Sequence, residues 1–214
     1  MHKSVNNLVS IEKEIQLKKD NVQIIAVSKT FPVNHIYPLI NHGHKDYGEN
    51  KVQEAVEKWT DIKKDFSHIQ LHLIGKLQTN KVKYALPLFD YIHSLDNTKL
   101  AEKIAAEQIK KNFKPKIFVQ VNIGNEDQKN GIDPKNLSKF VNNCKENLDL
   151  NIVGLMCIPP VNDNSQIFFE KMCELKKEMN LKDLSMGMSN DYMHAIDFDA
   201  NFVRIGSKIF GERS

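Results

Sequence analysis

Eight short apolar segments alternate with segments of helical periodicity along this chain of 214 residues. The apolar segments have the length and composition of buried strands, and the segments between them have the spacing of amphipathic helices. The expected strands are 22–28, 45–50, 69–75, 89–95, 116–123, 151–158, 182–187 and 202–206. The expected helices are 33–43, 51–64, 97–111, 134–147 and 165–179, with one more helix before the first strand. This alternation predicts parallel strands joined by crossover helices.

The number of these units narrows the α/β class further. Eight strand–helix units favour a closed (β/α)8 TIM-type barrel with an extra N-terminal helix over the alternative, an open doubly wound sheet. No linker, low-complexity tract or break in composition divides the chain, so we expect a single domain over residues 1–214.

Composition and charge argue against several classes of function. Thirty basic residues against 27 acidic ones leave a charge of +3, and the lysines stand among glutamates and aspartates, as in 57–65. This pattern is typical of a solvated surface and not of a nucleic-acid-binding face. No apolar run approaches about 18 residues, and the N-terminus lacks the apolar core of a signal peptide. The cysteines show no paired spacing, which predicts a cytoplasmic protein with reduced cysteines. The histidines are scattered, so we expect no metal site, and the lack of a long apolar run predicts no membrane segment.

Lys29 directly follows the first expected strand, in "IIAVSKT". Active sites of (β/α)8 barrels lie at the carboxyl ends of the strands. A lysine partly removed from water there exposes an amine for Schiff-base chemistry. The alternative is a lysine whose ammonium group simply reaches the solvent.

Two further segments follow the seventh and eighth expected strands. In "MGMSND" (186–191), Ser189 is expected to be the N-cap of the next helix. In "VRIGSKIFG" (203–211), Gly206 allows a close backbone approach and Ser207 can cap a helical turn. Each segment alone is explained by a plain helix cap. Together, from adjacent strands, they predict a phosphate-binding site.

Arg204 lies in the last apolar strand and is expected to face the barrel interior or to pair with a carboxylate. An amine and a phosphate site would suit a Schiff-base aldolase acting on a sugar phosphate, or a site for pyridoxal 5′-phosphate. The arginine favours the second, because it could face the pyridine nitrogen, which an aldolase has no need to contact.

Six segments in order resemble the YggS/PROSC family, the pyridoxal phosphate homeostasis proteins, which are related in fold to the N-terminal barrel of bacterial alanine racemase. The segments are "AVSKT" (26–30), "YGENKVQE" (47–54), "HLIGKLQTNK" (72–81), "GLMCI" (154–158), "LSMGMS" (184–189) and "VRIGSKIFG" (203–211). The likeness covers essentially the whole chain.

The resemblance implies that pyridoxal 5′-phosphate is bound by Lys29, Asn50, Met156, Met188, Ser189, Arg204, Gly206 and Ser207. In this reading Lys29 carries the cofactor as an aldimine, and Arg204 faces the pyridine nitrogen. Ser189 and the Gly206–Ser207 loop bind the phosphate, Asn50 lies beside the cofactor, and Met156 lines the pocket.

The chain departs from the family pattern at several positions. Phe31 stands where many relatives have a second lysine, which puts any role of that lysine in cofactor transfer in doubt here. Lys76 follows a glycine where proline or alanine is commoner, and Ser207 replaces threonine. Lys129 matches a family lysine that could offer a second amine.

The expected activity is weak. Arginine stays protonated and cannot hand a proton to the pyridine nitrogen, so the ring is a poor electron sink. The chain ends at Ser214, without the added domain from which racemases of this resemblance take a second base. We therefore expect a binder, not an enzyme, that acts in intracellular homeostasis of the cofactor by buffering or delivery.

Its expected partners are the cofactor and, transiently, apo-enzymes that use it, and we expect a monomer or weak homodimer. A low-activity amino-acid racemase and a cofactor-free aldolase remain alternatives, and a pure interaction module is the least favoured.

Overall fold

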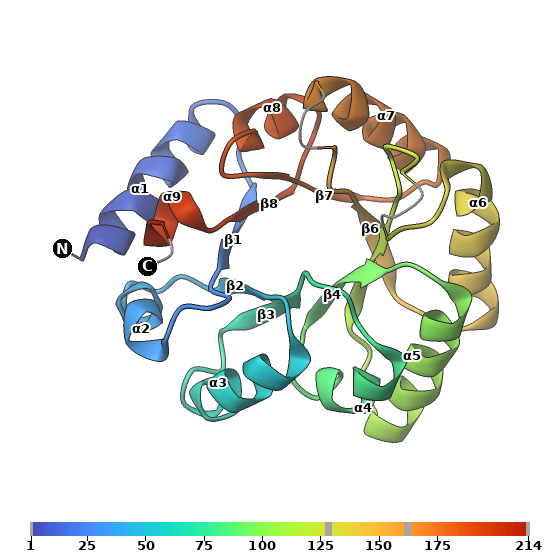
Figure 1. The fold of residues 1–214 in the computed structure, drawn as a ribbon, viewed down its shortest axis with the longest axis horizontal. Helices are drawn as coiled ribbons and strands as arrows, with labels where there is room; N and C mark the ends of the chain where they lie inside the picture. Colours follow the sequence, from blue (N-terminus) through green and yellow to red (C-terminus); the bar gives the residue numbers. More distant parts are fainter. Residues whose placement is uncertain (1, 127–129, 161–163, 213–214) are drawn as a thin grey trace.

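The structure, a computed structural model, describes residues 2–126, 130–160 and 164–212. It is a closed barrel in which each of eight strands pairs with the next and β8 pairs with β1 (Figure 1). The pairs are all parallel, with helices on the outside of the ring. The predicted (β/α)8 barrel with an N-terminal helix is therefore confirmed.

All eight expected strands are present. They are β1 (Gln23–Val27), β2 (Asp46–Glu49), β3 (Gln70–Leu73), β4 (Tyr91–Leu95), β5 (Lys116–Gln120), β6 (Ile152–Met156), β7 (Asp183–Met188) and β8 (Phe202–Ile205). The expected helices are α1 (Lys3–Gln16), α2 (Val33–Asn41), α3 (Val52–Asp65), α5 (Thr98–Lys111), α6 (Pro134–Asn142) and α7 (Ser165–Glu178). Across the described ranges, no helix is both long and apolar enough to cross a membrane.

Several short helical elements were not delimited by the sequence pattern. They are η1 (Thr79–Lys81), α4 (Val82–Ala85), α8 (Tyr192–Asp197) and α9 (Ser207–Phe210), whereas η2 (Asn143–Asn147), a π-helical turn that continues α6, lies within the expected helix 134–147. Each is less than two α-helical turns long, which is too short for a 3.6-residue repeat of apolar positions to appear.

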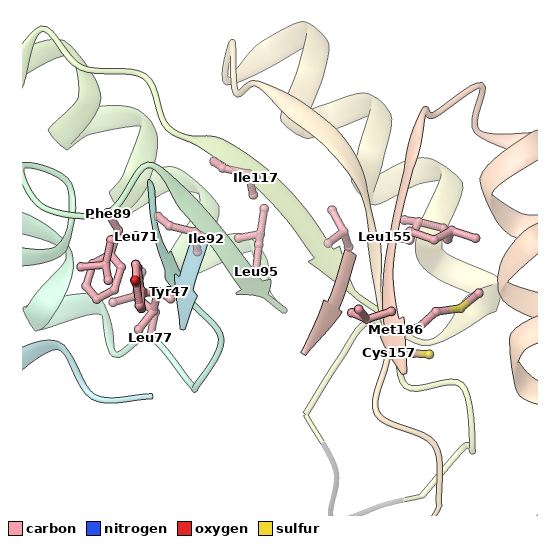
Figure 2. Packing of buried hydrophobic residues seen from close by; sticks show 14 of the residues in the cluster. Tyr47, Leu71, Leu77, Phe89, Ile92, Leu95, Ile117, Leu155, Cys157 and Met186 are labelled. Atoms are coloured by element: carbon pink, nitrogen blue, oxygen red, sulfur yellow. The ribbon is translucent and has the colours of Figure 1, made fainter. Parts of the chain in front are cut away.

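Apolar side chains of the strands divide between two clusters. Along β1, Ile24 and Ala26 belong to the large cluster between the strands and the surrounding helices. Ile25 points the other way, into a smaller cluster with Tyr91, Phe118, Met156 and Phe202. Figure 2 shows part of the large cluster, where side chains of several strands pack together. This two-sided burial explains why the strands read as continuous apolar runs and do not alternate with polar residues.

The seam between the first and last strands brings the two ends of the chain together. Ile25 lies opposite Arg204, and Ala26 opposite Ile205. Outside this seam, α1 packs against α9, and Asn7 Nδ2 donates a hydrogen bond to Ile209 O at 3.0 Å (Figure 1). The loop after β1 and the loop after β8 are therefore neighbours at the carboxyl end of the barrel.

Candidate functional site

A cavity of about 520 Å³ opens at the carboxyl ends of the strands. Its volume is within the range of pockets that take small-molecule ligands. Seven of the eight residues predicted for the site line it: Lys29, Asn50, Met188, Ser189, Arg204, Gly206 and Ser207. Ile74 and the run Ile158–Pro160 add an apolar wall. The structure thus gathers residues from six strand ends into one pocket with an amine, a guanidinium group and an apolar side.

Lys29 lies in a tight turn that begins where β1 ends. The turn is closed by Phe31 N, which donates to Ser28 O at 3.1 Å. Thr30 has a φ of 68°, in the left-handed region that β-branched residues rarely enter. Residues in such conformations persist where the surroundings fix them, and they cluster at functional sites. The half-buried side chain of Lys29 therefore extends from a turn whose backbone conformation is fixed by its surroundings.

Glu49, at the end of β2, holds the first residue of that turn in place. Its carboxylate is fully buried, and Oε1 accepts hydrogen bonds from Ser28 Oγ at 2.8 Å, Lys58 Nζ at 2.9 Å and Trp59 Nε1 at 3.0 Å. Lys58 Nζ also donates to Ser28 O at 3.0 Å. The sequence analysis did not single out Glu49. A carboxylate at the end of a buried strand is the signal that would have found it.

Arg204 occupies the barrel interior, one of the two positions expected from the sequence. Its side chain is nearly fully buried. Nη1 donates to Ser185 O at 2.7 Å and to Ser185 Oγ at 2.8 Å, and Nη2 donates to Cys157 O at 2.8 Å. Burial lowers the pKa of the guanidinium group, but arginine still stays protonated at neutral pH. The pocket therefore has a cation held rigidly by neutral acceptors.

Two helix caps differ from the prediction. α8 begins at Tyr192, so its N-cap is Asp191 and not Ser189. Asp191 Oδ1 accepts from Met188 N at 2.7 Å and closes the turn that contains Ser189. α9 begins at Ser207, so Gly206 is the N-cap. Ser189 lines the cavity from the turn before α8, and Ser207 lines it from the first position of α9.

Gly206 was expected to permit a close backbone approach. A Cβ atom built there would lie 3.5 Å from Val27, which is an ordinary contact. The packing of the described residues therefore does not require glycine at this position. Gly75, next to the cavity wall, does require glycine, because a Cβ there would lie 2.3 Å from Asn50 O.

Met156 does not line the cavity, and the expectation that it would is corrected. Its side chain is fully buried and packs in the inner cluster with Ile25 and Phe118. The last residue of β6 thus points into the barrel and not into the pocket. Lys129, which the sequence suggested as a second amine, lies outside the described residues.

Phe31, which stands where relatives often have a second lysine, also lines the cavity. Its ring stacks on Phe210 of α9, with 4.8 Å between the ring centroids. The aromatic pair joins the loop after β1 to α9. Lys76, another departure, donates to Asn130 Oδ1 at 2.9 Å and does not line the cavity.

Asn50 carries an acceptor that a bound group could use. Its Oδ1 atom is buried, and none of the described residues donates to it. A buried acceptor without a partner costs about 1–3 kcal/mol, so a ligand with a donor group at this wall would be favoured. In the described ranges, no group of three or more His, Cys, Asp or Glu side chains could hold a metal ion.

Comparisons with known proteins place the chain in a family. The family described as "Alanine racemase, N-terminal domain" matches residues 5–214. The pyridoxal phosphate homeostasis protein of Aquifex aeolicus is 40% identical over 200 residues, which cover 89% of this chain and 87% of the relative. The structure of PipY from Synechococcus elongatus with pyridoxal phosphate bound has a TM-score of 0.87 at 32% identity, covering 97% of this chain and all of PipY.

A more distant solved structure is an alanine racemase of Clostridium difficile, with a TM-score of 0.76 at 14% identity. It covers 99% of this chain and 57% of the racemase. This likeness shows the barrel fold alone. The family match and the high coverage of close relatives confirm the resemblance carried by the six sequence segments: the chain belongs to the alanine racemase N-terminal domain family and, within it, to the pyridoxal phosphate homeostasis proteins.

Proposed function

We propose that this chain binds pyridoxal 5′-phosphate in the cavity at the carboxyl end of the barrel and holds it covalently on Lys29. The protein would act in intracellular homeostasis of the cofactor, by buffering it or delivering it transiently to apo-enzymes, with little or no turnover. The observation that carries the proposal is the meeting of Lys29, Arg204 and two serine-bearing turns in one pocket. The bound cofactor in PipY, a relative of similar length, supports it.

The covalent step uses the amine of Lys29. Its nitrogen would attack the aldehyde carbon of the cofactor and form a carbon–nitrogen double bond. The aldehyde oxygen leaves as water and takes both hydrogens of the neutral amine. The apolar wall of Ile74 and Ile158 on the same cavity suits the pyridine ring.

The phosphate would be held apart from the aldehyde, by the turns that contain Ser189 and Ser207. These turns follow β7 and β8, which are neighbouring strands whose register places Met188 opposite Arg204. Hydroxyl groups and backbone N–H groups are the donors that bind phosphate in this region of a barrel.

Arg204 supports a binding role over demanding catalysis. An arginine is a permanent hydrogen-bond donor, so a pyridine nitrogen facing it accepts a hydrogen bond and stays unprotonated. A neutral ring withdraws electrons weakly from a bound amino group. The described partners of Arg204 hold it by three hydrogen bonds, so the group stays in place as the ring binds.

Reduction with borohydride tests the covalent assignment. We expect protein saturated with pyridoxal 5′-phosphate to carry a pyridoxyl group on Lys29 after reduction, because Lys29 is the described lysine that lines the cavity. Peptide mass mapping locates the label. A label on Lys76, Lys129 or another lysine, with none on Lys29, would contradict the proposal.

A low-activity racemase is the alternative, favoured by the family match to the alanine racemase N-terminal domain. We expect racemisation of alanine or serine under cofactor saturation to stay below about 1 s⁻¹, near the low end of enzyme turnover. Chiral chromatography measures the rate, and Lys29→Ala protein gives the background. A faster rate that depends on Lys29 would establish the racemase and overturn the binding role.

A further inference from the structure

A chain of buried polar side chains runs through the barrel from the cavity to its opposite end. Arg204 Nη1 contacts Ser185 Oγ at 2.8 Å, and Ser185 Oγ contacts His93 Nδ1 at 2.9 Å. His93 Nε2 then contacts His72 Nδ1 at 3.0 Å, and His72 Nε2 contacts Asp46 Oδ1 at 3.0 Å. The serine and both histidines are completely buried. The chain therefore links five strands through an interior that such barrels usually fill with apolar residues.

The groups at the two ends of this series of hydrogen bonds, Arg204 and Asp46, determine the position of each proton in it. The carboxylate of Asp46 only accepts hydrogen bonds, so His72 must carry a proton on Nε2. A neutral His72 then has an unprotonated Nδ1, which accepts from His93 Nε2. By the same reasoning His93 Nδ1 accepts from the hydroxyl of Ser185. The hydroxyl oxygen in turn accepts from Arg204, so all donors point from the guanidinium group toward Asp46.

We propose that Ser185, His93, His72 and Asp46 form a one-way hydrogen-bond chain that orients Arg204 and balances its charge from the far end of the barrel. They are positioning residues, since they act on the cavity through Arg204. The direction of these hydrogen bonds is a property of the protein without cofactor. Its effect on pyridoxal 5′-phosphate rests on the function proposed above.

The surroundings of the histidines keep both rings neutral. His93 stacks on Phe118 and His72 stacks on Tyr91, each with 4.3 Å between ring centroids. Burial lowers the pKa of both imidazoles, that of His93 strongly, and Arg204 lowers it further. The charged groups acting on His72 are Asp46 and Asp90, which oppose this shift, and Lys116, which adds to it. Beside Arg204 are the Cys157 thiol, whose pKa burial raises to about 12, and Asp191.

The far end of the chain is reachable from outside. The side chain of Asp46 is 18% exposed. It lines a second cavity, of about 360 Å³, together with Glu12, His42, His44 and Lys45. Neutralising Asp46 from this side would remove the anion that orders the chain. The orientation of Arg204 thus depends on a carboxylate at the other end of the molecule.

Nitrogen-15 NMR of the imidazole rings tests the chain in protein free of cofactor. We expect His72 and His93 to be neutral with the proton on Nε2, and to remain so as the pH falls through the range in which ordinary imidazoles gain a proton, because burial lowers the pKa of both rings. The exposed ring of His68 provides an internal reference for the nitrogen signals. A proton on Nδ1 of either buried ring, or a positive charge on either within that range, would overturn the proposed order.

A matched pair of variants tests the effect on the cavity. His93→Phe keeps a ring that can stack on Phe118 but removes both contacts of the chain, whereas Tyr91→Phe removes a polar group from the same interior without breaking it. We expect pyridoxal 5′-phosphate to bind His93→Phe about tenfold more weakly, the loss typical of a charge-assisted hydrogen bond, and Tyr91→Phe like wild type. Equal affinities of the two variants would refute the proposal.

Two further variants keep the test decisive if His93→Phe does not fold. His93→Gln retains one donor and one acceptor and should bind more tightly than His93→Phe. Asp46→Asn keeps an acceptor for His72 but removes the charge, and should shift the imidazole nitrogen signals of His72. An unchanged His72 spectrum in Asp46→Asn would contradict the proposed chain. Failure of wild-type protein to bind the cofactor would instead refute the proposed function, and the tautomers in free protein would still decide the chain.

Discussion

Replacing Lys29 by alanine is expected to abolish the visible absorption of the pyridoxal 5′-phosphate complex while leaving measurable binding. That absorption would arise from the proposed Schiff base with the Lys29 amine. The phosphate contacts proposed at Ser189 and Ser207 are separate from that bond. Charge-assisted hydrogen bonds contribute about 1.5–3 kcal/mol each, so several of them hold the ligand after the covalent link is lost.

Calorimetric titration of four protein–ligand combinations separates the contribution of the phosphate contacts from that of the covalent bond. Wild-type and Lys29→Ala protein are each titrated with pyridoxal 5′-phosphate and with pyridoxal. We expect both proteins to bind pyridoxal far more weakly, because it lacks the phosphate. Lys51→Ala is a matched control, since Lys51 is a highly exposed lysine that does not line the cavity. Equal affinities for the two ligands would show that the pocket has no phosphate site.

Loop variants locate the phosphate contacts. Ser189→Ala and Ser207→Ala should each weaken binding of the phosphorylated ligand about tenfold and leave pyridoxal binding unchanged. Gly206→Ala should fold normally, because its added Cβ meets only Val27 at 3.5 Å. Gly206→Val adds methyl groups that crowd the turn and should weaken phosphate binding more than Ser207→Ala does.

Glu49→Ala is expected to reduce the free energy of unfolding by about 3–5 kcal/mol, the cost of breaking a buried ion pair by removing one partner. The change leaves Lys58 Nζ, Trp59 Nε1 and Ser28 Oγ without the acceptor they share. Lys58 is only 13% exposed, so water restores little of the lost interaction. Urea unfolding monitored by circular dichroism gives the difference.

Glu54→Ala is the control for this measurement. Glu54 pairs with Lys51 on the surface, where both side chains are substantially exposed. Removing such a pair changes stability by about 0–1 kcal/mol. Comparable losses for Glu49→Ala and Glu54→Ala would mean that the buried carboxylate does not anchor the turn that contains Lys29.

The strands of this barrel were predictable because each is buried on both faces. Segments such as 22–28 and 116–123 contain three or more consecutive apolar residues, which distinguishes them from the amphipathic helices between them. The ends of these strands then pointed to the cavity, since a parallel barrel places all carboxyl ends on one side. Lys29 and Arg204 were identified by this reasoning and line the pocket.

Features that depend on side-chain direction or on distant pairs were not predictable. Met156 ends its strand as Lys29 nearly does, but its side chain points into the inner cluster. The caps of α8 and α9 shifted by one or two residues, because short helices leave several adjacent polar residues able to cap them. His93 contacts Ser185, which is 92 residues away in sequence. No local spacing reveals such a contact, so the histidines read as scattered.

The seam between β1 and β8 joins parts of the cavity wall that lie far apart in the sequence. Lys29 follows β1, whereas Arg204 lies in β8 and Ser207 is the first residue of α9. This part of the cavity wall therefore forms only when β1 and β8 have paired, so the closed barrel is the state that can bind a cofactor. Once bound, the cofactor would connect the segments that follow β1 and β8. Because a ligand stabilises the state that binds it, loss of cofactor should loosen the barrel first at this seam.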